Sequence, residues 1–211
     1  MNERDYIRRL ADEARDTVDM LSFHRKGERE QRSCAAFLRC LGVDFSPDEL
    51  VTAENDPPDV VFRDARFEVM IVLDEGMKMH ADWKKEASRR DSAQSLDDLA
   101  QPYQPSVPMC FKEAVCLVVA KLCPKASHYG PKTCSQLDVL VYIDRARRHL
   151  YPISEVNVPT ELRSQGWRSV CFLFLPYSHV LFAAPEAPEF LRSLEGRTRQ
   201  ECNNPDVWFE L

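Results

Sequence analysis

Residues 57–73 read Pro57-Pro-Asp-Val-Val-Phe-Arg-Asp-Ala-Arg-Phe-Glu-Val-Met-Ile-Val-Leu73 and are the most informative stretch for the fold. Two runs rich in β-branched and aromatic residues, 59–62 and 67–73, flank the short connection Arg63-Asp-Ala-Arg66. That spacing predicts a β-hairpin. Pairing Phe62 with Phe67 would place Asp59 opposite Met70.

Side chains alternate across a strand, so the hairpin has two distinct faces. Asp59, Glu68 and Met70 are predicted to project from one face. The other face collects the apolar residues of the hairpin and is predicted to be core: Val60, Phe62, Phe67, Val69, Ile71 and Leu73. We expect Val69 and Ile71 to be buried beneath a helix that begins at Met109.

Helical and strand patterns surround the hairpin. Apolar residues recur with helical spacing up to about His24 and again from Glu28 to Leu41, with Gly27 as the break. The elements expected after the hairpin are a basic helix over 78–91, a loop over 92–107, an all-round apolar helix over 109–123 started by Pro108, strands over 136–143, 169–175 and 179–184, and short helices over 159–165 and 187–194. This order predicts one α/β domain over residues 1–211 with a central mixed sheet, and residues 1–26 as an N-terminal helical appendage.

Composition narrows the class of protein. The 211 residues are 44% apolar and 29% charged, which is typical of a globular domain. The longest apolar run, Ala114–Ala120, is far shorter than the ~20 residues of a membrane span, and the charged N-terminus does not resemble a signal peptide. The net charge, 28 − 34 = −6, argues against a protein that coats nucleic acid nonspecifically.

The eight cysteines form no C-x-x-C pair, and no two histidines are spaced as zinc ligands. Free cysteine acts as a small hydrophobe at the positions where these residues lie: Cys34 and Cys40 in one predicted helix, Cys110, Cys116 and Cys123 in another, and Cys171 in the apolar run 170–175. A reducing, cytoplasmic location is therefore expected. A cysteine hydrolase is disfavoured because no cysteine lies beside a recognisable base.

The candidate chemistry lies on the acidic face of the hairpin. Two carboxylates among apolar neighbours are costly to bury unless a cation or hydrogen bonds compensate them. Asp59 and Glu68 are therefore candidate ligands of Mg²⁺ or Mn²⁺; the alternative is an edge hairpin whose acids face solvent. Glu30, at one end of the apolar stripe of its helix, is either a third acid for this site or a first-turn acid that complements the helix dipole.

The order of these elements resembles that of the PD-(D/E)xK superfamily. A helix with an acid is followed by Pro58-Asp59, by a strand with Glu68-x-Met70, by a buried helix and by a further strand. More narrowly, nearly the whole chain resembles a proteobacterial domain-of-unknown-function family described as endonucleases. The resemblance implies a restriction-endonuclease-like three-layer fold and Mg²⁺-dependent hydrolysis of phosphodiester bonds in nucleic acid, with DNA favoured over RNA. It makes Asp59 and Glu68 the metal ligands and Glu30 a supporting acid.

Met70 departs from this pattern, because the family has a lysine two residues after the glutamate. That lysine is expected to orient the attacking water and offset phosphate charge, which a thioether cannot do. Lys78 or Lys84 could supply the amine from another part of the backbone, and Lys78 is the first candidate. Two functions remain open: a metal-dependent endonuclease, or an inactive relative that binds or scaffolds. A lysine amine within ~3–4 Å of the carboxylates would favour the enzyme, whereas Met70 and other apolar groups filling that space would favour the scaffold.

Two further features have weaker functional interpretations. Arg145-Ala-Arg-Arg-His149 follows a predicted strand and either contacts phosphates or forms a solvated loop. Trp83 and Trp167 either stack on bases or belong to the core.

Overall fold

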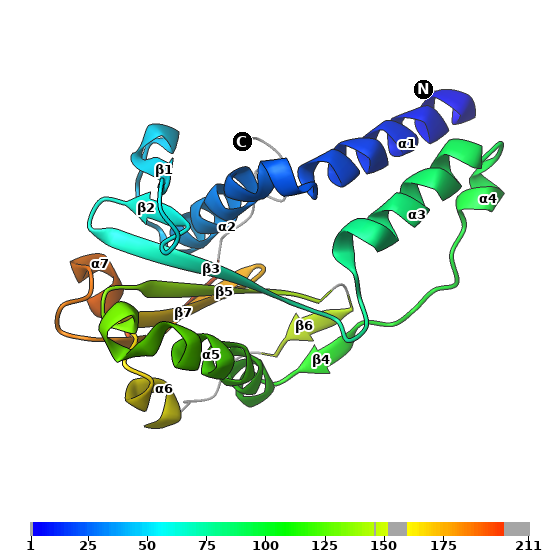
Figure 1. Cartoon of the computed structure of the whole chain (residues 1–211). Coiled ribbons are helices and arrows are strands. Elements are labelled where there is room, and N and C mark those ends of the chain that lie inside the picture. The colour runs from blue at the N-terminus through cyan, green and yellow to red at the C-terminus, as the bar shows by residue number, and fades with distance from the viewer. Residues whose placement is uncertain (1, 146, 152–159, 201–211) are drawn as a thin grey trace. The chain divides into compact units, whose positions relative to one another are not determined.

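Figure 1 shows the computed structural model of the chain, which describes residues 2–145, 147–151 and 160–200. A seven-stranded sheet is its centre. The strands, in spatial order, are β1 (Leu50–Thr52), β2 (Val60–Phe62), β3 (Ala65–Leu73), β5 (Asp138–Asp144), β7 (Ser169–Phe174), β8 (Tyr177–Ala183) and β9 (Thr198–Gln200). β5 and β7 pair in parallel, whereas β1–β2, β2–β3, β7–β8 and β8–β9 are antiparallel. The predicted α/β fold with a central mixed sheet is confirmed.

Helices cover both faces of this sheet and make three layers (Figure 1). On one face, α2 (Lys26–Leu41) and α7 (Glu189–Arg192) share a core cluster with Val60, Phe62, Phe67 and Val69. On the other, α5 (Phe111–Cys134) and α6 (Thr160–Ser164) share a second cluster with Met70. The central strands are buried on both sides, as their apolar sequences require.

This arrangement confirms the predicted split of hairpin faces and corrects one expectation about packing. Val69 packs on the α2 side, not beneath the helix that follows residue 109, and Ile71 is only half-buried. Met70 is the hairpin residue that packs with the α5 cluster, where it is 5% exposed. Trp167 is 2% exposed in the same cluster, so its core interpretation is correct.

α5 differs from its prediction at both ends. Pro108 lies in β4 (Val107–Met109), which pairs in parallel with β6 (Arg148–Leu150), and the helix begins after Cys110. Its start is stabilised by a capping box in which the Glu113 carboxylate accepts the Cys110 N–H at 2.7 Å. The helix continues past residue 123 and is interrupted at Gly130, whose φ is 74°. It is buried on one side only.

Residues Met1–Arg29 and Leu73–Pro105 form one compact unit, and Glu30–Val72 with Ser106–Leu211 form a second. In the first unit, α1 (Glu3–Met20) packs on α3 (Met79–Ser92), with an ion pair of 2.7 Å between Arg15 and Asp91. The expected loop over 92–107 contains α4 (Leu96–Leu99), and α1 ends earlier than predicted, at Met20. Gly27 lies inside α2 rather than between helices, after a short 3₁₀ turn at Phe23–Arg25.

The seven cysteines of the described residues are free thiols. Cys34, Cys40 and Cys171 are buried as predicted, whereas the expectation that Cys110, Cys116 and Cys123 are core residues is wrong, since all three are exposed. Among the described helices, none combines the length and the apolar character that crossing a bilayer requires.

Candidate metal centre

The hairpin register brings the two predicted acids together. Val60 pairs with Phe67 and Phe62 with Ala65, so the turn is the two-residue Arg63-Asp64 and the register lies two residues from the predicted one. Because side chains alternate with period two, this shift leaves every side chain on its predicted face. Continued by one residue, the observed register sets Asp59 across from Glu68 instead of Met70, and the Asp59 N–H donates to the Phe67 carbonyl at 2.9 Å.

The tight turn depends on Arg63, which has a φ of 52°. Two-residue hairpins favour Asn or Gly in this left-handed conformation, so the local sequence offers no signal for it. Contacts from elsewhere hold the arginine: its Nε donates to Glu49 at 2.8 Å, and its guanidinium lies 4.7 Å from the centre of the Phe62 ring.

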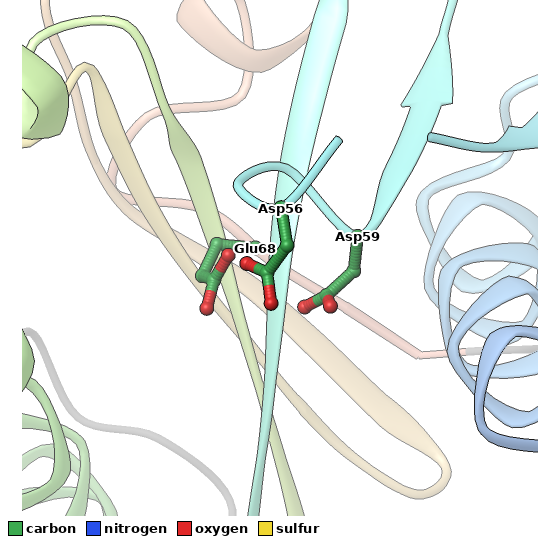
Figure 2. Close-up of side chains that lie close together, drawn as sticks. All are labelled: Asp56, Asp59 and Glu68. Carbon is green, nitrogen blue, oxygen red and sulfur yellow. The ribbon is translucent and has the colours of Figure 1, made fainter. Parts of the chain in front are cut away.

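Three carboxylates meet where β2 begins, at the end of the hairpin away from its turn, as Figure 2 shows. Asp56, Asp59 and Glu68 each offer one oxygen, and the three oxygens lie within 4.8 Å of one another. Asp59 and Glu68 are 7% and 2% exposed, whereas Asp56 is exposed to solvent. Sequence reasoning missed Asp56, whose only signal was its place just before Pro57-Pro58 in the loop that enters β2.

Hydrogen bonds orient the two buried acids. Asp59 Oδ2 accepts the Val69 N–H at 2.9 Å. Glu68 Oε1 accepts from the Tyr129 hydroxyl at 2.9 Å and lies 2.9 Å from Lys125 Nζ. Glu68 Oε2 is buried and has no hydrogen-bond partner. A buried carboxylate oxygen without a protein partner is unusual, and a water molecule or an ion at this position would satisfy it.

The electrostatics of the group follow from this geometry. Burial raises the pKa of Glu68, the Lys125 hydrogen bond lowers it, and the nearby Asp59 charge raises it further, so the pKa lies above the ordinary value. Burial alone would lower the pKa of Lys125, but hydrogen bonds to Tyr129 and Glu68 raise it. Lys125 is therefore a cation at neutral pH. Burial also raises the pKa of Tyr129 to about 12, so its hydroxyl stays protonated and donates.

Lys125 is the basic residue that sequence reasoning missed. It lies on α5, three residues after the buried Leu122 and four before Tyr129, and so belongs to the buried face of the helix. A lysine on an apolar helical stripe was the available signal. Its partner could not be read from the sequence, because Glu68 lies on a strand far away along the chain.

The other predicted site residues lie in different settings. Lys78 and Lys84 are exposed and belong to the compact unit that does not contain the acids; the backbone N–H of Lys78 donates to Asp82 at 2.8 Å before α3. Glu30 is 8% exposed in α2 and is not one of the three clustered carboxylates. Burial raises the pKa of the Cys34 thiol, and the charges of Asp59 and Glu30 raise it further, so both acids act on the same thiol.

The donor set suits a hard divalent cation. Carboxylate oxygens are the ligands that Mg²⁺ and Mn²⁺ prefer, and buried charges are normally paired or metal-bound. The partnerless Glu68 Oε2 and the exposed Asp56 leave oxygens available at the centre. The residues present therefore fit a metal ion.

Fold and site together define a mixed α/β protein with a carboxylate-rich centre supported by a lysine. The chain belongs to the family described as "Putative endonuclease, protein of unknown function (DUF1780)", whose model matches residues 2–203. A solved structure from Pseudomonas aeruginosa strain PAO1, described as a protein of unknown function, PA4535, of the monooxygenase superfamily, is 30% identical to the chain, with a TM-score of 0.62. The match covers 99% of this chain and 100% of the other. No curated protein matches the chain.

Proposed function

We propose that the protein is a metal-dependent endonuclease that hydrolyses phosphodiester bonds in nucleic acid, with DNA favoured over RNA. The observation that carries the proposal is the Lys125 amine, 2.9 Å from Glu68 Oε1. The PD-(D/E)xK pattern requires a lysine beside the second acid, and Met70 stands at that position. Lys125 would supply the amine from α5, and its distance from Glu68 supports an enzyme over an inactive scaffold, although Met70 itself is packed in the apolar cluster beneath α5.

Each residue then has a definite role. Asp59, Glu68 and Asp56 would hold Mg²⁺ or Mn²⁺, which when bound polarises a phosphate oxygen and activates water. The Val69 N–H keeps the Asp59 carboxylate oriented, and Tyr129 holds Glu68 and Lys125 in register. Lys125 places a positive charge where charge develops on the phosphate. Glu30 is a supporting acid, and the role offered to Lys78 is assigned to Lys125.

The monooxygenase description of the Pseudomonas protein points to a different chemistry. One large class of non-haem iron oxygenases uses two histidines and one carboxylate as ligands. The group found among the described residues is made of carboxylates alone, with a cation beside it. That donor set supports hydrolysis of a phosphodiester, in agreement with the family description.

A cleavage screen tests the proposal. Wild-type protein with Mg²⁺, Mn²⁺ or EDTA is incubated with plasmid, linear duplex, single-stranded DNA and RNA. We expect metal-dependent cleavage that falls at least ~10²-fold in Asp59→Asn, because a ligand is lost. Asp64→Asn, an exposed acid in the turn of the same hairpin, is the matched control and should cleave like wild type.

Calorimetry separates metal binding from activity. Mn²⁺ binding should be detected in wild type and in Asp64→Asn, and lost in Asp59→Asn. Equal metal affinity in all three proteins, together with no detectable cleavage by the wild type, would contradict the proposal and favour the scaffold alternative.

A further inference from the structure

The start of α5 borders a second feature, distant from the carboxylates. A hollow of about 350 Å³ lies among the first turns of α5, β6 and the end of β5. Three cations line it: Lys112 from α5, Arg145 after β5, and Arg148 from β6. Figure 1 shows the beginning of α5 next to β4 and β6, which brings these segments together.

The lining is cationic although the protein is acidic. Three cations and one carboxylate, Glu113, give a local sum of 3 − 1 = +2, against −6 for the whole chain. The Glu113 carboxylate is also engaged in capping Cys110 at 2.7 Å. Positive charge thus exceeds negative charge in the lining of this hollow, so an anion would be held there at a defined place.

The remaining lining and the helix axis favour a phosphate group. Met109 and Leu117 add apolar surface and Cys116 a thiol, so the hollow can contact more than a bare ion. The hollow lies beside the first two turns of α5, near the positive end of the helix dipole, which favours negative charge at this end of the helix. Arginine side chains bind phosphate oxygens in a forked, two-bond geometry.

We infer that this hollow binds a backbone phosphate of the nucleic-acid substrate at a distance from the cleavage site; the inference rests on the proposed function. Lys112 precedes Lys125 by 13 residues on the same helix. At 1.5 Å per residue, the two lie about 20 Å apart along its axis. One strand of a duplex carries a phosphate every ~3.4 Å of axis, so this separation corresponds to about six phosphates. The pocket would anchor the strand while the carboxylate centre acts on another phosphate.

Binding measured without cleavage tests this. Anisotropy of a fluorescein-labelled duplex of about 20 base pairs is followed in EDTA over a range of salt concentrations. Arg148→Gln should weaken binding roughly fivefold at ~0.1 M salt and reduce the slope of log K against log salt by about one. Arg147→Gln is the matched control, because this exposed neighbour carries the same charge and does not line the hollow. Its slope should equal that of wild type.

Two more variants distinguish a lost phosphate contact from a loss of folding. Lys112→Gln alters an exposed side chain and should reproduce the Arg148→Gln effect. Glu113→Gln keeps an oxygen for the Cys110 cap and removes the opposing charge, so it should tighten binding about two- to fivefold. A gain of affinity cannot result from unfolding.

Three results would overturn the inference. One is the same affinity and the same salt slope in Arg148→Gln, Lys112→Gln and Arg147→Gln. That result would show that the duplex responds only to the overall charge of the surface and not to a defined pocket. The second is a wild-type protein that does not bind the duplex but whose melting temperature is raised by inorganic phosphate, an increase that Arg148→Gln abolishes. That result would show a pocket for a small phosphorylated molecule. The third is a wild type that binds neither. Because EDTA stops cleavage, none of these results depends on the Asp59→Asn test, and the two proposals can fail separately.

Discussion

α5 uses the same type of side chain in opposite ways at its start and midway along its length. At the start, Lys112 is exposed and lines an open hollow with Arg145 and Arg148. Thirteen residues later, Lys125 is half-buried and its amine is committed to Glu68 and Tyr129 at 2.9 and 2.7 Å. The helical face decides the difference, because Lys125 continues the buried stripe and Lys112 does not. A solvated cation remains available to a ligand, whereas a buried one organises the groups around it.

The largest expected effect concerns turnover. Lys125→Met should lower the maximal rate of metal-dependent cleavage about 10²–10³-fold, because a charge beside the reacting phosphate is lost. Lys121→Met, one turn earlier and exposed, is the matched control and should keep the wild-type rate. Lys112→Met should act on KM. Initial rates over a range of DNA concentrations separate the effects on kcat and KM. A change in kcat alone for both Lys112→Met and Lys125→Met would contradict the different roles of the two lysines.

The second effect is the pH dependence of the free energy of unfolding, which depends on a histidine packed against the start of α5. Phe111 packs edge-on against His179, with ring centres 4.7 Å apart, and burial lowers the pKa of His179 to about 4. The unfolded state, with a pKa near 6.5, binds the proton more tightly, so stability present above pH 6.5 is lost as pH falls toward 4. The loss should reach about 3 kcal/mol.

Denaturant unfolding at pH 7, 6, 5 and 4 measures this loss. His179→Gln should flatten the slope between pH 6.5 and 4, whatever its stability at pH 7. Glu68 works in the other direction, since its raised pKa makes protonation favour the folded state as pH falls. An unchanged slope in His179→Gln would place the pH-sensitive group elsewhere.

The third effect is the stability of the carboxylate end. Lys125→Met leaves a buried carboxylate without its cation and should cost about 2 kcal/mol, less than a fully buried pair because the lysine side chain is 38% exposed. Lys112→Met should change stability by under ~0.5 kcal/mol. Mn²⁺ should restore part of the loss in Lys125→Met by neutralising the acids. Urea unfolding with Mn²⁺ or EDTA measures both, and a loss insensitive to Mn²⁺ would argue against a shared centre.

The smallest effect comes from moving the amine. Met70→Lys alone should not increase cleavage, because Lys125 already supplies the charge. The double variant Met70→Lys with Lys125→Met should cleave about tenfold faster than Lys125→Met alone, because position 70 lies on the same strand face as Glu68. Rates of the double variant are compared with Lys125→Met at equal folded fraction, determined by circular dichroism. No recovery in a folded double variant would mean that the cation must come from α5.

The predictable part of the fold is local. Periodicity alone predicted the hairpin faces, the central strands and the apolar stripes, because alternation and helical spacing are properties of neighbouring residues. The errors lie where distant contacts decide. Arg63 adopts a positive φ in contact with Glu49, and Pro108 pairs in a strand with β6.

The sequence by itself determined that Asp59 and Glu68 share one face of a strand pair, since a register error of two residues cannot exchange the faces. It also showed that the expected lysine is absent at Met70. Only the tertiary structure decided that Asp56 joins them, that Lys125 lies beside Glu68, and that Lys112 meets Arg145 and Arg148. Those neighbours come from a loop, a helix and other strands, and their distances depend on how α5 packs on the sheet, which no local pattern encodes.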